Sequence, residues 1–141
     1  MGNKQSSVKK ANFEDIQQII KTNNNSLLIN TLNTNEQNCL IKGTIAIDKE
    51  EMIINKNLNN LAMKIIVYDK NSSQDHLYKK YHQLINLGFY EVYVYPGGLF
   101  EWLLLQDIYG SESFPTSTQE LDILKFKPRS AFSTNYLMNI D

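Results

Sequence analysis

Residues 65–68, Ile-Ile-Val-Tyr, form the run that most constrains the fold of this chain. A short run of β-branched and aromatic residues between Lys64 and Asp69 predicts a strand that is buried on both faces. A polar loop follows, and then apolar residues recur at the spacing of one helix face, at Leu77, Tyr81 and Leu84. A buried strand that leads into an amphipathic helix is typical of parallel sheets, because helices cover both faces of such sheets.

The same alternation of strands and helices runs along the chain. Short apolar runs predict further strands at residues 27–29, 39–47 and 92–95. Helical spacing and N-cap residues predict helices that begin after Asn12 and at Asp48, a helix over 74–86, and a fourth that begins near Phe100 and ends near Gly110. We therefore predict an α/β fold, with a single domain built on a central, mainly parallel β-sheet flanked by helices.

Size and composition exclude several classes of protein. The chain has 141 residues, which is enough for one ordinary hydrophobic core. The net charge of −1 argues against a generally basic nucleic-acid binder. The single cysteine, Cys39, excludes a disulfide framework and a thiolate zinc cluster and suits a reducing compartment. We expect a cytoplasmic protein with no nucleic-acid partner, no metal and no cofactor.

We expect four segments: a flexible basic leader, a main domain, a C-terminal helical extension packed on that domain, and a loose tail, at residues 1–11, 12–110, 111–128 and 129–141. The helix in the extension is predicted by Ser117 and Glu120, which have the spacing of a capping box ahead of a short apolar run.

The leader carries the clearest functional motif. Its first residues, Met-Gly-Asn-Lys-Gln-Ser, match the N-myristoylation pattern, in which Gly2 is acylated and Ser6 is the preferred hydroxyl residue. One myristoyl chain holds a protein at a membrane only marginally, so a second signal is needed. Lys4, Lys9 and Lys10 would supply it at an anionic surface. We therefore predict a peripheral protein on the cytosolic face of a membrane; the alternative is an ordinary start peptide.

Five pieces of the sequence, spread over residues 12–109, resemble the rhodanese-like domain family. Residues 27–32 resemble the family's opening strand, and residues 40–45 resemble its His-Ile-x-Gly-Ala-Ile segment. Residues 65–68 resemble the strand that delivers the active-site loop. Residues 87–98, followed by Trp102, resemble the Gly-Phe-x-x-Val…Gly-Gly…Trp signature. The resemblance implies the rhodanese-like fold for residues 12–110.

The departures from the family pattern argue against the family's activity. In the family, a cysteine directly follows the delivering strand, carries a persulfide and opens an anion-binding loop. Here that position is Asp69, and the arginine near the end of the loop has no counterpart. A carboxylate cannot accept sulfane sulfur as a thiolate can. We interpret seven residues as a degenerate active-site loop with no catalytic residue: Asp69, Lys70, Asn71, Ser72, Ser73, Gln74 and Asp75.

Three functions remain open at this point. The first is a non-catalytic rhodanese-like module, a pseudoenzyme that is lipid-anchored and binds an unidentified protein partner. The second is a small enzyme of the sulfurtransferase or phosphatase type that uses Asp69 or Cys39 as nucleophile. The third is a structural component of a viral particle. The loop favours the first hypothesis, since it keeps neither the thiol nor the arginine.

Two other groups of residues have a structural explanation. His76 and His82 are six residues apart on one predicted helix, so they do not share a face and would not chelate a metal together. The aromatic residues after residue 89 are candidates for a recognition patch, but their spacing favours the core: Tyr90, Tyr93, Tyr95, Phe100 and Trp102.

Overall fold

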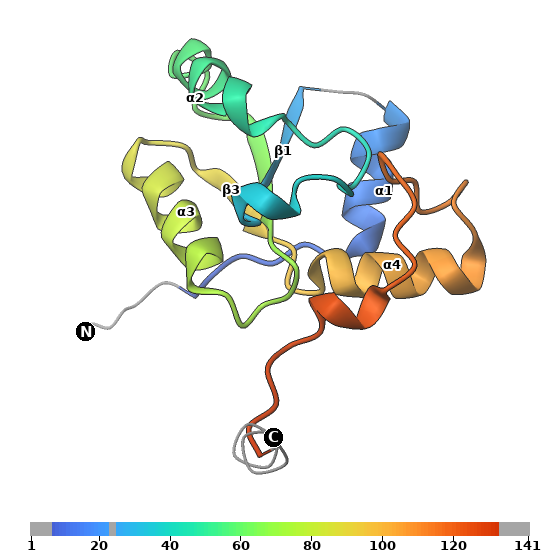
Figure 1. The fold of residues 1–141 in the computed structure, drawn as a ribbon. Coiled ribbons are helices and arrows are strands. Elements are labelled where there is room, and N and C mark those ends of the chain that lie inside the picture. Colours follow the sequence, from blue (N-terminus) through green and yellow to red (C-terminus); the bar gives the residue numbers. More distant parts are fainter. Residues whose placement is uncertain (1–6, 23–24, 133–141) are drawn as a thin grey trace.

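The computed structural model describes residues 7–22 and 25–132 (Figure 1). Three parallel strands lie in the order β1 (Ser26–Asn30), β2 (Lys64–Tyr68) and β3 (Glu91–Val94). In this register Ile66 lies opposite Leu28 on one side and opposite Tyr93 on the other. The predicted central strand is confirmed as β2.

Four α-helices surround the sheet: α1 (Phe13–Thr22), α2 (Ile47–Lys56), α3 (Asp75–Asn86) and α4 (Gly98–Tyr109). The side-chain oxygen of Asn12 caps α1, accepting hydrogen bonds from the backbone N–H groups of Glu14 at 2.9 Å and Asp15 at 3.1 Å. Gly88 follows the last turn of α3 with φ +112°, a conformation that favours glycine after a helix.

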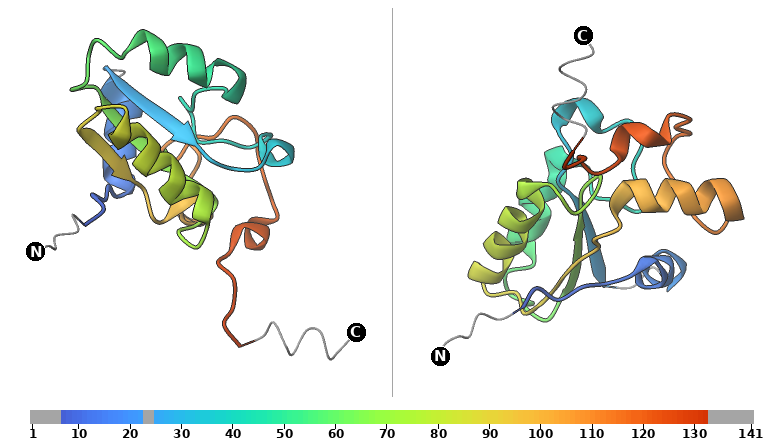
Figure 2. Two further views of the ribbon diagram at one scale, coloured as in Figure 1. Left: turned by 90° about the vertical axis from the view of Figure 1, so that its left-hand side faces the viewer. Right: turned by 90° about the horizontal axis from the view of Figure 1, so that it is seen from below.

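The helices form one layer on each face of the sheet (Figure 2). Along β2, Ile65 and Val67 pack in the cluster that contains the buried residues of α2 and α3. Ile66 and Tyr68 pack in the other cluster, with the buried residues of α1 and α4. Every second side chain of a strand points to the same face, so one apolar strand serves two cores. The prediction of a single α/β domain with a parallel sheet flanked by helices is confirmed.

Most of the aromatic residues after residue 89 are core residues, as their spacing predicts. Trp102 and Tyr95 are fully buried and meet edge to face, with ring centroids 6.3 Å apart. Tyr93 and Phe100 are half-buried against the same cluster. Tyr90 is the exception, because most of its side chain is exposed.

The strand predicted over residues 39–47 does not form. Thr44 makes one isolated bridge to Leu28, and Ile41 makes one to Thr116. The backbone of this segment bonds instead to the C-terminal part of the chain, since Lys42 donates to the carbonyl oxygen of Pro115 at 3.1 Å and Ser117 to that of Leu40 at 2.8 Å.

The helix predicted in residues 111–128 forms only in small part. The segment packs on the domain, but its helical part is only a short 3₁₀ helix, η2 (Ile123–Phe126). The Ser117 hydroxyl does not cap a helix; it accepts a hydrogen bond from the N–H of Leu40 at 3.0 Å and donates to the carbonyl of Asn38 at 3.1 Å. Glu120 pairs with Lys125 at 2.8 Å.

The end of the leader is held by the sheet, although the sequence predicts a flexible segment through residue 11. The N–H of Val94 donates to the carbonyl of Lys9 at 2.9 Å, and the N–H of Ala11 donates to the carbonyl of Val94 at 2.8 Å. Ala11 is buried and Val8 is half-buried. Residues 8–11 therefore pair alongside β3, on the edge that does not face β2.

The expected anchor residues Gly2 and Lys4 lie outside the described residues. Within the described ranges, none of the helices combines the length and the apolar character that crossing a membrane requires.

Candidate functional site

The loop after β2 begins with a buried carboxylate. Asp69 is 2% exposed and follows the middle strand of the sheet at its carboxyl end, where parallel α/β sheets place their ligands. One carboxylate oxygen accepts a hydrogen bond from the hydroxyl group of Thr31 at 2.6 Å, and the other accepts one from the backbone N–H of Lys70 at 2.7 Å. Both oxygens of Asp69 are thus engaged inside the protein.

The first turn of α4 lies directly against this loop. The N–H groups of Leu99 and Phe100 donate to the carbonyl oxygens of Asp69 at 3.0 Å and Lys70 at 2.9 Å. Helix N-terminal N–H groups are the usual donors for a bound anion. At this site they bond to the loop's own backbone.

The one cation of the loop is paired. The ammonium group of Lys70 lies 3.1 Å from a carboxylate oxygen of Glu36, which belongs to η1 (Thr34–Glu36) after β1. Both side chains are only about a quarter exposed or less. The positive charge that would attract an anion to the loop is therefore balanced by a neighbour.

The C-terminal segment covers the next part of the loop. Asn71 is buried, and its amide donates to the backbone carbonyl of Phe126 at 2.9 Å, while its carbonyl oxygen accepts the N–H of Ser73 at 2.8 Å. Phe126 is itself 3% exposed and belongs to the core beside α4. Of the remaining loop residues, Ser72, Ser73 and Asp75 are exposed and Gln74 is half-buried.

Burial also changes the protonation of the site. Removal from water raises the pKa of Asp69 above its usual range, against the smaller opposing effects of the Thr31 and Lys70 hydrogen bonds and the Lys70 charge. The folded state therefore holds the Asp69 proton more tightly than the unfolded chain does. The contribution of this group to stability is fully present below about pH 3.9 and is lost as the pH rises through the folded-state pKa.

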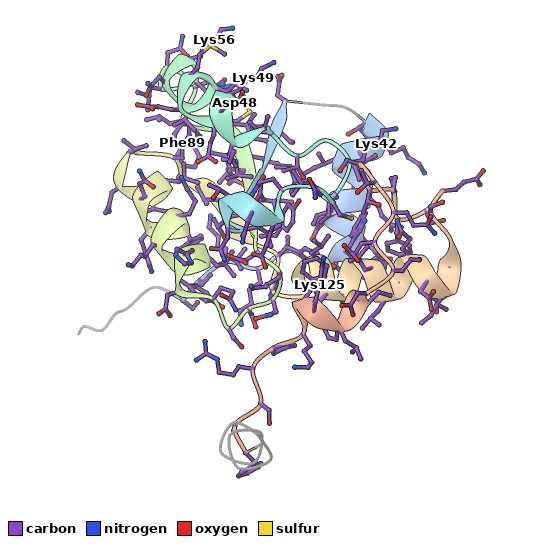
Figure 3. All side chains as sticks on the ribbon, viewed as in Figure 1. Lys42, Asp48, Lys49, Lys56, Phe89 and Lys125 are labelled. Atoms are coloured by element: carbon purple, nitrogen blue, oxygen red, sulfur yellow. The ribbon has the colours of Figure 1, made fainter. Side chains whose placement is uncertain are left out.

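We therefore expect Asp69→Asn to be more stable than the wild type at pH 7, and the advantage to shrink as the pH falls toward 4. The reason is that the amide carries no charge to desolvate and keeps the shape of the carboxyl group. Urea unfolding between pH 4 and pH 7 measures the difference. Asp48→Asn, at an exposed carboxylate on α2 (labelled in Figure 3), is the control and should show no such rise. A uniform loss of stability in Asp69→Asn would contradict this prediction.

Cys39, the other candidate nucleophile, is a core residue. It is buried, and its thiol donates to the carbonyl of Thr118 at 3.3 Å. His76 and His82 are exposed on α3. In the ranges the structure describes, no group of three or more metal-binding side chains comes together.

Three residues that sequence reasoning missed complete the loop: Thr31, Glu36 and Phe126. The position of Thr31 could have been predicted from the sequence, because Thr31 follows β1 and neighbouring parallel strands end at the same edge of a sheet. Its N–H indeed bonds to the carbonyl of Tyr68 at 2.9 Å. Glu36 and Phe126 carry no local signal, since tertiary packing alone brings them to residues 70 and 71.

Comparison with known proteins identifies the fold family. The sequence model of the rhodanese-like domain matches residues 12–105, which is more than half of the chain. The chain belongs to the rhodanese-like family. The rhodanese-like domain begins one residue before α1 and ends within α4, so the match includes the whole sheet and the loop after β2.

Solved structures of low sequence identity share this rhodanese-like fold. The Alr3790 protein from Anabaena sp. superposes with a TM-score of 0.55 at 16% identity, covering 82% of this chain and 97% of that one. The yeast protein Ygr203w, described as a protein tyrosine phosphatase of the rhodanese family, gives 0.56 at 14% identity, covering 81% and 94%. Thiosulfate sulfurtransferase from Pseudomonas aeruginosa gives 0.56 at 15% identity, covering 84% of this chain and 23% of that one. No curated protein matches the chain.

Proposed function

We propose that this rhodanese-like domain is a non-catalytic module, a pseudoenzyme that acts through protein contacts at the cytosolic face of a membrane. The observation that carries the proposal is Asp69, a buried carboxylate with both oxygens hydrogen-bonded, directly after β2. Sulfur transfer needs a thiolate to attack and carry the sulfur, and residues 69–75 contain no thiol.

The electrostatics of the loop support the same proposal. An anionic substrate or intermediate needs free N–H donors and positive charge. The N–H groups of Leu99 and Phe100 bond to the loop itself, Lys70 is paired with Glu36, and Asp69 adds a competing anion when it is ionised. The N–H groups at the start of α4 and the charge of Lys70 are therefore not free for a thiosulfate or phosphate ion.

An outer face of α4 supports a role in protein contacts. Helices that are apolar on all sides are normally buried. On α4, Trp102 and Leu103 are buried in the core, yet Ile108 and Tyr109 are about two-thirds exposed. A protein partner would remove these side chains from water.

The expected result for catalysis is the absence of turnover. Thiosulfate:cyanide sulfur transfer and hydrolysis of an aryl phosphate by the purified full chain should not exceed the rate without protein. The alternative enzyme would use Asp69 or Cys39, so Asp69→Ala and Cys39→Ser should leave this background unchanged. Turnover that either substitution abolishes would overturn the non-catalytic assignment.

The membrane part of the proposal rests on Gly2 and the basic leader. Lys9 contributes little as a mobile charge, because its ammonium group donates to the carbonyl of Tyr90 at 2.7 Å and lies 5.2 Å from the centre of the Tyr93 ring. Lys10 is exposed, and Lys4 lies outside the described residues. Myristate with one or two free lysines gives reversible attachment.

We expect Gly2→Ala, expressed in eukaryotic cells, to move from the membrane fraction to the soluble fraction. A single myristoyl chain contributes an association constant of about 10⁴ M⁻¹, so its loss should lower partitioning by orders of magnitude. Intact mass spectrometry reports the acyl group directly, and Asn3→Ala, which keeps Gly2, is the control. If the wild type carries no myristoyl mass, the leader is an ordinary start peptide.

A further inference from the structure

Residues 121–132 form a surface stretch in which large apolar and cationic side chains alternate; we call it the C-terminal surface stretch. Leu121 is 81% exposed, Leu124 is 62% exposed and Phe132 is 91% exposed. The only acid of the stretch is Asp122. Its three cations are Lys125, Lys127 and Arg129. Large side chains this exposed cost free energy in water unless another surface covers them.

The 3₁₀ geometry of η2 decides which side chains point outward. Residues three apart share a face of such a helix. Ile123 and Phe126 therefore face the domain together, where Phe126 is buried and Ile123 is half-buried against the core. The residues between them, Leu124 and Lys125, are left on the exposed side.

The fold holds the η2 part of this stretch in place. The amide of Asn71 binds the carbonyl of Phe126, and η2 packs against α4 (Figure 1). The exposed side chains of η2 are thus presented from a rigid base, so ordering them at a second surface costs less conformational entropy.

Most cations of the stretch are exposed and could interact with an anionic partner. Lys125 pairs with Glu120 at 2.8 Å, but its side chain stays about half exposed. Lys127 and Arg129 are exposed and form no ion pair with any described residue. Arg129 is also the only arginine of the chain.

We infer that the C-terminal surface stretch binds an anionic lipid surface. Cations next to exposed aliphatic and aromatic side chains match both layers of such a surface, because phosphate and carboxylate headgroups attract the cations while the apolar side chains enter the acyl boundary. A nucleic acid would not cover Leu121 and Leu124, and the stretch offers one exposed aromatic ring, Phe132, for base stacking.

This inference goes beyond the proposed function, since it needs neither acylation of Gly2 nor an inactive loop. It places a second membrane contact at the other end of the chain from the leader. The experiment therefore uses the unacylated full chain, so that failure of the Gly2 anchor and failure of this contact are separate results.

The test is co-sedimentation with two kinds of vesicle. The neutral vesicles are phosphatidylcholine alone, and the mixed vesicles are phosphatidylcholine with about 30% phosphatidylserine, an anionic lipid. The wild type should bind the mixed vesicles, bind the neutral ones much less, and lose binding as salt is raised. Lys127→Gln with Arg129→Gln should lower the partition coefficient about 25-fold, since each basic residue near an anionic surface strengthens binding about fivefold. Leu124→Ser with Phe132→Ser should lower it at least about tenfold.

The matched control is Lys49→Gln with Lys56→Gln. It removes the same charge from exposed positions on α2, at the far end of the molecule from Lys125 (Figure 3). This pair should bind like the wild type. Equal losses in the control pair and in the Lys127 and Arg129 pair would mean that net charge alone drives binding, and would overturn the inference.

A local probe tests contact at the stretch itself. In Phe132→Trp, the new indole should shift its emission to shorter wavelength on mixed vesicles, while Trp102 is already buried and gives a constant background. An unchanged emission spectrum would overturn the inference. So would binding to RNA or to an acidic protein without binding to the mixed vesicles.

Discussion

Gly98→Ala is expected to lower the free energy of unfolding by about 2–5 kcal/mol. Gly98 opens α4 with φ +66°, where a non-glycine residue costs about 1–2 kcal/mol. A Cβ atom there would also lie 2.5 Å from the carbonyl oxygen of Asp69 and 2.7 Å from the carbonyl carbon of Lys70. Backbone atoms cannot rotate away as a side chain can, so overpacking adds about 1–3 kcal/mol.

Two other glycines separate the causes of this loss. Gly110 has φ +102° and ψ 157°, a conformation that is almost restricted to glycine. Apart from its chain neighbours, no described atom lies within 4 Å of the position that an alanine methyl group would take, so Gly110→Ala should cost only the conformational strain, about 1–3 kcal/mol. At Gly97 the backbone is right-handed helical and the methyl group would meet the flexible side chain of Glu101. Chemical unfolding measures the free energy of unfolding of the three alanine variants, at positions 97, 98 and 110. A cost for Gly98→Ala no larger than that for Gly110→Ala would show that α4 does not press on the loop.

Trp102→Ala is expected to cost about 3–5 kcal/mol. The indole is fully buried, meets the Phe114 ring edge to face at 5.0 Å between centroids, and donates its N–H to the carbonyl of Pro115 at 3.2 Å. It therefore joins α4 to the segment that covers the loop, and its loss would leave a large cavity at that junction. Urea unfolding measures the change in stability, and amide hydrogen exchange of residues 114–126 should speed up before that of β2.

Trp102→Phe is the control for this prediction. It keeps an aromatic ring against Phe114 and Tyr95, so it should cost about half as much or less. The carbonyl of Pro115 stays hydrogen-bonded, because the N–H of Lys42 donates to it at 3.1 Å. Equal losses for the Ala and Phe variants would mean that the indole N–H, and not the volume of the side chain, joins the segment to α4.

The local pattern determined the sheet and its helices. Residues 65–68 are apolar without interruption, and only a strand covered on both faces buries such a run, so β2 was predictable as the central strand. The stripe of Leu77, Tyr81 and Leu84 similarly determined α3, because one helix face carries all three. The resemblance of residues 87–98 to the family signature pointed to the same fold, which the family match confirms.

The candidate site was predictable only in its first residue. Asp69 follows the central strand in the chain, so its place at the carboxyl edge of the sheet follows from the prediction of β2. Its burial, its bond to Thr31 and the raised pKa that results depend on groups from other elements. The pairing of Lys70 with Glu36 brings together residues far apart in the chain.

Tertiary structure alone decided the segments that have no periodicity of their own. Residues 39–47 have the composition of a strand, but the backbone at Leu40 and Lys42 bonds to residues 115–117, more than 70 positions later in the chain. Ser117 has the sequence position of a helix cap, yet its hydroxyl group is hydrogen-bonded to the backbone of Asn38 and Leu40. Residues 8–11 look like a free leader and instead pair with the open edge of β3. In each case the backbone groups of one segment are paired by groups far away in the chain, and a local pattern carries no information about a distant partner.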